Sequence, residues 1–550
     1  MDNTVQHIIK RADQLNSFRS PWEQLWQDCT DFVNPRRGDF NSTQARASRN
    51  RFDKVFDSTA GIANEQLAAG LHGHLTNEAE HWFTLRLKNT VTEDDSMRAW
   101  IDDTVETMFD STFALPATNF TTALHELYLD LGSYGTAVMY VEDRPGRVIN
   151  FRTYHLADCY IAENHEGRVD TLYRKYKHTA RQLVQLYEDV LPDRVKEAAL
   201  KTPQQEYTCI HAVEPRDDYN DESKKSEDLP FKSCYVLVEE KLMLREGGFN
   251  EFPYLVPRWS KTAGEVYGRS PAMMCMPDIK MVNEMMKTVI RASQKATDPP
   301  LMVPDDGFML PLRTIPGGLN YYRSGTGDKV EPLMSGSRPD LGMDFIDNRR
   351  EHIQRAFHVD WLQLGQTPQM TATEVIQRQE DKMRLMGPMV GRLQTEFLGP
   401  LVDRVFKILS RRELFAMPPE SYIGEDLQVD YISPVARAQK AQLVFNFSRF
   451  LESIIPLANI KPEIFDNLDA DNAFRWAHAT LDVPMDTILP VEERDQQRQE
   501  RAEAEQAAQQ AALAQQEASA VKDVATAEKD LTQAEQVEAE GEAGGEEAVY

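Results

Sequence analysis

Few residue patterns in this sequence could perform chemistry, and the nearest approach to a nucleotide site is incomplete. A phosphate-binding loop, G-x-x-x-x-G-K-[ST], places glycine before its lysine and a hydroxyl residue after it, because backbone amides and these side chains hold the phosphates and their Mg²⁺. Residues 324–329 read Ser-Gly-Thr-Gly-Asp-Lys, and Val330 follows Lys329. The segment also lacks a strand–loop–helix frame. The sequence therefore predicts no ATP site here.

Metal ligation has similarly weak support. His72 and His74 are two positions apart, a spacing that suits a metal only on an extended backbone with further ligands from elsewhere. Asp466, Asp469 and Asp471 resemble the start of a calcium loop, but the glycine and the distal glutamate of that loop are absent. The five cysteines form no C-x-x-C pair and are expected to be reduced and buried. The sequence predicts no metal site and no cofactor.

Covalent catalysis is not indicated either. Neither G-x-G-x-x-G nor G-x-S-x-G occurs, and no nucleophile stands beside an evident base. We therefore expect that the protein is not an enzyme. A terminase-type ATPase or nuclease remains a less favoured alternative, because it would need a phosphate loop or an acidic metal cluster.

Charge and composition limit the kind of partner. The chain of 550 residues carries a formal net charge of −27, which argues against a protein that wraps and holds DNA. It does not argue against an acidic wall with local basic points, past which DNA slides. No apolar run reaches membrane-spanning length, and the N-terminus lacks a signal-peptide core. We expect a soluble protein of two to four domains, made in a cytoplasm, with no membrane partner.

The elements that would position functional side chains centre on a long helix within residues 263–297. Ser270 is expected to cap it, Pro271 fits its first turn, and Pro277 is expected to kink or restart it. One face is apolar, at Ile279, Val282, Met286 and Val289. A second, mostly basic face carries Lys280, Glu284, Lys287, Arg291 and Lys295. Taken alone, this pattern is also typical of a surface helix with one solvated side.

Residues 1–262 predict an α+β unit with helices around a modest antiparallel sheet. Two helices are expected within residues 3–34, with a break at Ser20-Pro21. The strand patterns lie at 81–87, 136–154, 168–178, 206–215 and 233–247. Further helices are expected near 94–113, 118–131, 179–190 and 193–201.

Residues 298–340 are rich in proline and glycine and are too long for an idle loop. A helix follows at 341–358, with Arg349, Arg350 and Arg355 on one face and Phe345, Ile346, Ile353 and Phe357 on the other. After a loop at 359–370, a helical run from Thr371 to about Phe415 is expected to bend at Gly387-Pro388 and Gly399-Pro400.

The last third of the chain is predicted to be helical. Further helices are expected within 430–490. Residues 491–550 contain 16 acidic and 5 basic residues among alanine and glutamine. This tail is either a solubilising segment or a helical extension, and disorder is expected from about Gly541.

This order of elements resembles the portal, or head-to-tail connector, proteins of short-tailed double-stranded DNA phages. The resemblance covers nearly the whole chain. It rests on Gly264-Glu-Val-Tyr-Gly-Arg-Ser270 before a helix, Thr371-Ala-Thr-Glu374 opening the bent helix, Leu489-Pro-Val-Glu-Glu493 before the tail, Leu131-Gly-Ser-Tyr-Gly-Thr-Ala137 before the sheet, and the break before Trp22.

The resemblance implies a portal-type fold, predominantly helical, assembled as a dodecameric ring around a DNA channel. Its parts would be a wing (1–262), two stem helices (263–297 and 341–358), a clip (298–340), a tunnel loop (359–370), a kinked helix with a return to the wing (371–429), a crown (430–490) and an acidic tail (491–550). The paired apolar and basic faces of the first stem helix would supply the two unlike contacts that a ring subunit needs.

It also implies partners and sites. The partners would be further copies of the chain, capsid and scaffolding proteins, the terminase during packaging, the tail adaptor, and the double-stranded DNA. The location would be the head–tail vertex of the virion. Candidates for the channel wall are Arg349, Arg350, Arg355, Gln363, Gln366 and Gln369. Candidates for contacts between subunits are Lys280, Glu284, Lys287, Arg291 and Lys295. Another ring or adaptor protein of the head–tail interface remains an alternative.

Overall fold

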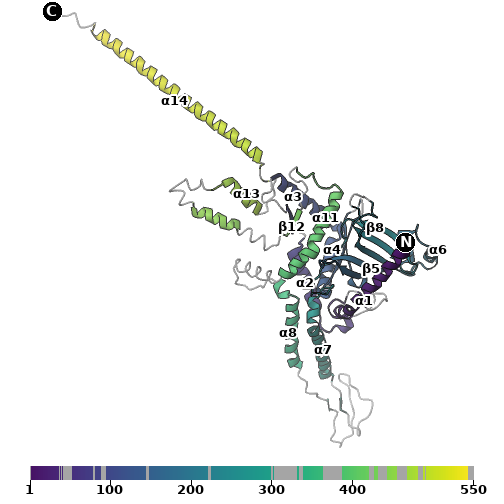
Figure 1. Cartoon of the computed structure of the whole chain (residues 1–550). Helices are drawn as coiled ribbons and strands as arrows, with labels where there is room; N and C mark the ends of the chain where they lie inside the picture. Colours follow the sequence, from purple (N-terminus) through teal and green to yellow (C-terminus); the bar gives the residue numbers. More distant parts are fainter. Residues whose placement is uncertain are drawn as a thin grey trace, which may run out of the picture.

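The computed structural model describes residues 2–35, 38, 40, 52–77, 81–87, 95–143, 146, 148–220, 225–298, 301–302, 331–332, 339–362, 387–419, 427–431, 443–454, 468–480, 487, 489 and 491–542. A body of helices and sheets forms the centre, the helices α7 and α8 project from it as a hairpin, and α14 extends away in another direction (Figure 1). The fold is α+β and mainly helical, as predicted.

The first helix, α1 (Asp2–Phe32), continues through Pro21, so the predicted break at Ser20-Pro21 is wrong. A proline inside a helix deletes one backbone hydrogen bond, which neighbouring tertiary contacts can offset. The buried Arg19 guanidinium donates to three carbonyl oxygens between residues 156 and 159 at 2.9 to 3.1 Å. On the other side of the proline, Trp26 is fully buried. The helix is therefore held to the body on both sides of Pro21.

Five antiparallel strands form a meander in chain order: β4 (Cys159–Glu163), β5 (Val169–Thr179), β6 (Glu206–Pro215), β7 (Phe231–Leu237) and β8 (Leu242–Phe249). The strands predicted at 168–178, 206–215 and 233–247 are confirmed as β5, β6 and the β7–β8 pair, whereas β4 was not predicted. Two short helices, α5 (Ala180–Tyr187) and α6 (Asp193–Lys201), connect β5 to β6.

Two smaller sheets complete the body. The predicted hairpin within residues 136–154 forms β2 (Val138–Glu142) and β3 (Asn150–Tyr154), and β9 (Tyr254–Leu255) pairs with the other edge of β2. The predicted strand at 81–87 forms β1 (Phe83–Leu87), which pairs with β12 (Leu427–Tyr431). This pairing brings the chain back to the body after the bent helix.

Three helices pack beside these sheets: α2 (Thr59–Leu75), α3 (Asp95–Met108), which continues into a π-helical turn at Phe109–Phe113, and α4 (Phe120–Tyr134). One apolar core runs without interruption from these helices into the hairpin. It joins Tyr128 of α4 to Ile279 and Phe357 of the hairpin. The hairpin is therefore an extension of the body and not a separate domain.

The hairpin consists of α7 (Pro271–Thr297) and α8 (Pro339–Ala356), with the short α9 (Val359–Leu362) after it. At 1.5 Å per residue α7 is about 40 Å long. The helix continues across Pro277, so the restart that was expected as one possibility does not occur. Between the two helices, β10 (Leu301–Met302) pairs with β11 (Glu331–Pro332). Most of 298–340, with the Ser324–Lys329 motif, lies outside the described residues.

The bent helix is described from residue 387. Residues 387–393 are helical, Gln394–Leu398 form a π-helical turn, and α11 (Gly399–Arg411) follows. The Gly399 amide donates to the Gln394 carbonyl, five residues back. Because Pro400 has no amide hydrogen, the ordinary pattern is already interrupted there, and the π turn absorbs the defect. Residues 363–386, with the expected cap at Thr371, lie outside the described residues.

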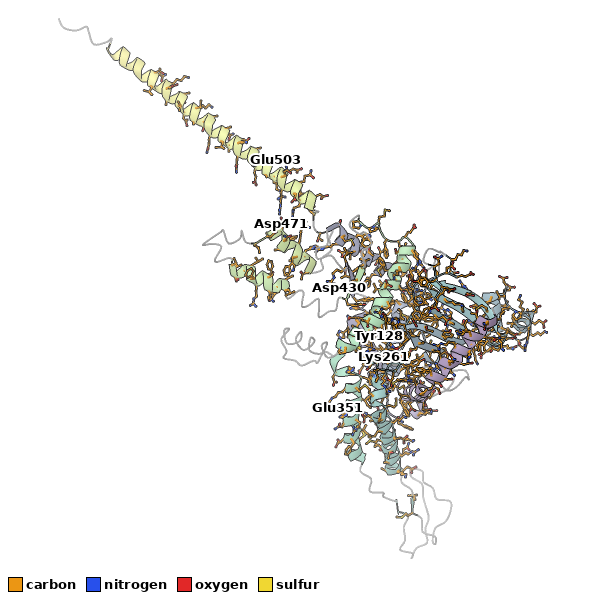
Figure 2. All side chains as sticks on the ribbon, viewed as in Figure 1. Tyr128, Lys261, Glu351, Asp430, Asp471 and Glu503 are labelled. Atoms are coloured by element: carbon orange, nitrogen blue, oxygen red, sulfur yellow. The ribbon has the colours of Figure 1, made fainter. Side chains whose placement is uncertain are left out.

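The C-terminal part holds a helix at 443–454, α13 (Ala470–Thr480) and α14 (Val491–Glu542). Side chains crowd together in the body, whereas those along α14, such as Glu503, stand clear of other elements (Figure 2). The tail expected to be partly helical is thus helical through Glu542.

Candidate functional site: the two sides of the α7–α8 hairpin

The hairpin is fixed to the body where α7 begins. The Ser270 hydroxyl accepts from the Met273 amide at 3.0 Å, which confirms the predicted cap, and it donates to the Ser133 carbonyl at 2.8 Å. Gly268 and Gly135 lie back to back here, since a Cβ on Gly268 would come within 2.3 Å of the Gly135 carbonyl oxygen. Gly135 also has a φ of 73°, which favours glycine. The root of the hairpin therefore requires both glycines.

The apolar stripe of α7 packs inside its own chain. Ile279 and Val282 are buried, and Met286 and Val289 are partly buried against the same core. On α8 the inward residues are Ile346 and Ile353, and Phe357 directly follows the helix; all three are buried. The expectation that this apolar stripe supplies a face to a neighbouring copy is therefore wrong, because helices of the same chain already cover it.

Phe345 was expected on the buried face of α8, but its side chain is 68% exposed. A helix turns by about 100° per residue, so Ile346 occupies the inward position and Phe345 points to one flank. On α7, Met274 is 75% exposed and Met281 is 46% exposed. These three apolar side chains were not predicted to be a surface.

An ion pair places these exposed side chains on one side of the hairpin. Arg349 of α8 contacts Asp278 of α7 at 3.3 Å. Asp278 is four residues after Met274 and three before Met281, and Arg349 is four residues after Phe345, so each charge lies beside its apolar neighbours. We call this surface, made of Met274, Met281 and Phe345, the bare side of the hairpin.

The other side is covered by α1 and residues 52–57. Asn283 accepts from the Phe56 amide at 2.7 Å and donates to the Lys54 carbonyl at 3.0 Å. Lys280 pairs with Asp28 of α1 at 2.7 Å. We call this surface the covered side. It shows that part of the predicted basic stripe is used within the chain.

The remaining residues of the predicted basic stripe make fewer ion pairs with other elements. Lys287 contacts Glu284 on the same helix at 3.0 Å. Arg291 and Lys295 are exposed near the end of α7. The five predicted stem residues therefore share one flank of the helix, with internal partners toward its root.

Arg350 forms ion pairs within its own chain. It contacts Asp57 at 2.7 Å and Asp347 at 2.9 Å. Asp57 also accepts from the Thr59 amide at 2.9 Å, at the start of α2. Burial alone would raise the pKa of Asp57, but the hydrogen bonds from Thr59 and the guanidinium of Arg350 lower it below its usual value. This ion pair joins α8 to α2.

Arg355 is the most exposed of the three predicted channel arginines. Its side chain contacts Glu351 at 3.4 Å and Asp360 at 3.9 Å, and it is 64% exposed. The other channel candidates, Gln363, Gln366 and Gln369, lie outside the described residues.

A buried arginine that the sequence analysis missed links the hairpin root to the bent helix. Arg258 is 1% exposed and pairs with Glu163 at the end of β4. It also donates to both carboxylate oxygens of Glu396, in the π-helical turn, at 2.8 and 3.0 Å. Lys261 contacts Glu163 as well. No local pattern marks this cluster, because its members are brought together only by the fold.

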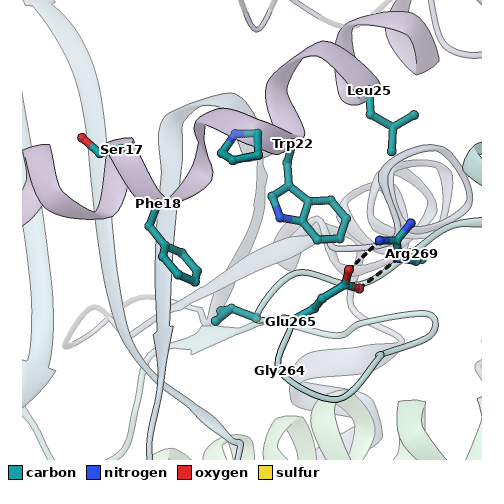
Figure 3. Close-up of a pocket in the computed structure, with 9 residues that line it drawn as sticks. Ser17, Phe18, Trp22, Leu25, Gly264, Glu265 and Arg269 are labelled. Atoms are coloured by element: carbon teal, nitrogen blue, oxygen red, sulfur yellow. Dashed lines mark hydrogen bonds and ion pairs between the residues drawn. The ribbon is translucent and has the colours of Figure 1, made fainter.

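The covered side carries an open apolar groove of about 530 Å³ between α1 and residues 264–269 (Figure 3). Phe18 and Trp22 of α1 form one wall, and the ion pair between Arg269 and Glu265 forms the other. The Arg269 guanidinium lies 5.2 Å from the centre of the Trp22 ring. Phe18 is 56% exposed, so this surface has room for an apolar side chain from another molecule.

The residues that resembled metal sites have other roles. His72 and His74 lie in the last turn of α2, which is not the extended backbone that joint ligation would need. Asp469 accepts from the Asn472 amide at 3.0 Å near the start of α13, and Asp471 pairs with Arg498. Asp466 lies outside the described residues. Among the residues that the structure describes, no three His, Cys, Asp or Glu side chains are grouped to hold a metal.

Comparison with known proteins identifies the family. The sequence model of the family described as "Bacteriophage head to tail connecting protein" matches residues 5–489. The chain belongs to this family. It is 31% identical over 489 residues to the "Probable portal protein" of Bordetella phage BPP-1, covering 86% of each chain. It is 30% identical over 507 residues to the "Portal protein" of Salmonella phage epsilon15, covering 90% of each chain.

Membership in the head-to-tail connecting family confirms the resemblance drawn from the sequence. The match ends at residue 489, where the acidic tail begins. Within the described part of the chain, no helix is both long enough and apolar enough to cross a bilayer.

Proposed function

We propose that this member of the family assembles into a closed ring, dodecameric as the portal resemblance implies, around a DNA channel at the head–tail vertex of a virion. The observation that carries the proposal is the difference between the two sides of the α7–α8 hairpin. Apolar side chains protrude from the bare side, and an apolar groove lies on the covered side. A ring with one rotation axis joins each copy to the next by two different surfaces, one on each flank. The bare side and the covered side meet this requirement.

The proposed contact joins an apolar projection to an apolar groove. Met274, Met281 and Phe345 protrude from the bare side, and Phe18 and Trp22 line a groove on the covered side. Burying a side chain of this size contributes about 1.5 to 3 kcal/mol, which repeated contacts around a ring would multiply. Lys280 to Lys295 lie on the flank of α7 between these two surfaces and would border the contact.

The portal parts then map onto the chain as a proposal. The wing is 1–262, the stem 263–297 and 341–358, the clip 298–340, the tunnel loop 359–370, the kinked helix and its return 371–429, and the crown 430–490. The uninterrupted core between body and hairpin supports a stiff stem. The Arg258 cluster supports a rigid joint between stem and kinked helix.

DNA passage would then depend on weak contacts. Arg349 and Arg350 are paired within the chain, so Arg355 is the preferred described arginine for the channel wall, beside Gln363, Gln366 and Gln369 of the tunnel loop. With a net charge of −27, the ring would hold phosphates at a few points only. Weak attraction lets a duplex move in during packaging and out during ejection.

The partners follow from the same proposal. After synthesis in the host cytoplasm, the ring would join capsid and scaffolding proteins. Its clip would seat the terminase and later the tail adaptor. Both tasks rest on the family to which the chain belongs and on the place of 298–340 in the sequence, between α7 and α8.

The test is the assembly state of purified full-length protein. Native mass spectrometry should give a species of about 750 kDa, twelve times the 62.9 kDa chain, and negative-stain images should show rings with an open centre. Met281→Asp with Phe345→Asp should abolish rings yet leave a folded monomer. The matched control is Leu200→Asp, an exposed apolar residue on α6 that should assemble normally. A wild-type protein that stays monomeric at all concentrations would contradict the proposal.

A further inference from the structure

The helix α14 has almost no partner within its own chain. It contains 52 residues, about 78 Å at 1.5 Å per residue, and it extends away from the body (Figure 1). Its base is held by Arg494 and Arg498, which pair with Asp471 of α13 at 3.2 and 2.5 Å. Every described side chain from Asp495 to Gln533 is exposed. Burial therefore contributes nothing to this helix in a single chain.

Its exposed surface nevertheless has an apolar pattern. Four large side chains, Leu513, Val521, Val524 and Leu531, are each at least 60% exposed. At about 100° per residue they divide into two stripes whose centres are about 130° apart. The first, the leucine stripe, contains Leu513, Ala520, Val524, Ala527 and Leu531. The second, the valine stripe, contains Ala511, Ala514, Ala518, Val521 and Ala525.

Charges of opposite sign border the two stripes. By helical phase Asp523 follows the outer edge of the leucine stripe, and Lys522 and Lys529 follow the outer edge of the valine stripe. None of these three residues has an opposite charge three or four positions away, where pairs within a helix form. Each of them can therefore pair with a charge on another helix.

This arrangement disfavours a two-stranded parallel coil built on the leucine stripe. In such a coil Asp523 occupies the position that faces Glu528 of the partner helix, so like charges meet. Packing the leucine stripe against the valine stripe of another copy has the opposite result. Asp523 then lies beside Lys522 of the next copy.

We propose that α14 packs side by side with α14 of both neighbouring copies, leucine stripe against valine stripe, as a ring of parallel helices. This inference rests on the proposed ring and names the contact that continues it beyond the body. A helix in a ring of twelve meets its neighbours about 150° apart, close to the spacing of the two stripes. The occupant of each stripe is thus a second copy of this chain.

The same geometry assigns an inner wall. The direction midway between the stripes faces the axis of the ring, because neighbours in a ring always subtend less than 180° on the inner side. Glu528 occupies this direction by helical phase. The ring of helices would therefore present a circle of carboxylates to its bore, which repel phosphate and leave a duplex free to slide.

Cysteine pairs in the full-length protein test the contact. All five native cysteines are buried, so introduced thiols will dominate the reaction. With Val521→Cys and Val524→Cys together, a short bis-maleimide should link one copy to the next and give a ladder of multimers up to the closed ring. Either substitution alone should leave monomers, because each contact joins position 524 of one copy to position 521 of another.

Controls separate the outcomes. Thr526→Cys with Gln533→Cys places thiols on the polar back of α14 and should give no ladder. If Val524→Cys alone gave cross-linked dimers, and the double variant gave no larger multimers, α14 would form a two-stranded coil. That result would overturn the inference. No cross-link in particles that imaging shows to be rings would overturn it while leaving the proposed function intact. Absence of any ring would contradict both.

The charged borders provide a second test. Lys522→Asp should reduce the ladder severalfold, since an acid then faces Asp523 across every contact. Adding Asp523→Lys to the same chain should restore it. Failure of this rescue would exclude the assigned pairing of edges.

Discussion

At the scale of single residues, His211 is a buried titratable group with partners on both ring nitrogens. It is buried between sheets, with its ring stacked on Tyr235 at 4.0 Å between ring centres. Its two nitrogens contact the Tyr254 hydroxyl at 2.6 Å and the Ser233 hydroxyl at 3.0 Å. Burial, with Arg174 and Arg245 nearby, lowers the pKa of His211 to about 3. The folded protein therefore keeps the His211 ring in its neutral form.

This predicts a specific loss of stability in mild acid. The unfolded chain takes up a proton at His211 near pH 6.5, whereas the folded chain does so only near pH 3, so the unfolded state gains protons as pH falls. The contribution is complete above pH 6.5, and about 1.5 kcal/mol of unfolding free energy should be lost between pH 6.5 and 5. Urea unfolding at several pH values measures this.

The reference protein is His211→Gln, which is expected to be less stable than the wild type at pH 8. Its disadvantage should shrink as pH falls, because glutamine does not titrate. Parallel stability curves for the two proteins from pH 8 to pH 4 would rule out this role for His211.

At the scale of elements, the π-helical turn at Gln394–Leu398 shows how a bend is stabilised. Gly399-Pro400 interrupts the backbone pattern, and Glu396 in the turn pairs with the buried Arg258. The turn thus combines a proline defect with a buried ion pair.

Removing the carboxylate should therefore be costly. We expect Glu396→Ala to lower the unfolding free energy by about 3 kcal/mol, because Arg258 remains buried with one carboxylate partner fewer. Hydrogen exchange should rise at residues 387–398. The control is Glu197→Ala, in an exposed pair with Lys201, which should cost at most about 1 kcal/mol. A Glu396 variant as stable as this control would refute the structural role of the pair.

At the scale of the whole molecule, two surfaces dominate: the unlike sides of the hairpin and the exposed α14. Both carry apolar side chains that a single chain leaves in water. Together with membership in the head-to-tail connecting family, they support the proposed assembly of several copies.

A structural ring needs no turnover of its own. Purified protein with Mg²⁺, ATP and double-stranded DNA should hydrolyse no ATP above background and leave the DNA uncut. The sequence has no complete phosphate loop, and the described residues hold no acidic metal cluster. If the protein hydrolysed ATP and Lys329→Ala abolished that activity, the 324–329 segment would be a nucleotide site. The expectation of no enzymatic activity would then be wrong.

The sequence by itself determined the features that depend on neighbours along the chain. Periodicity marked α7, α8 and strands β5 to β8, and Ser270 marked a helix start, because capping and amphipathic spacing are local. The order of these elements also carried the resemblance to the family that the comparisons confirm. Side-chain types sufficed for these conclusions.

Only the tertiary structure decided which of those side chains are buried, which are exposed and which contact distant segments. It continued α1 through Pro21, because Arg19 and Trp26 anchor the helix to residues far along the chain. It buried the apolar stripe of α7 within the chain and left Phe345 exposed. It also assembled Arg258, Glu163 and Glu396 from three distant segments. Such outcomes depend on which elements meet in space, and no spacing along the sequence encodes that directly.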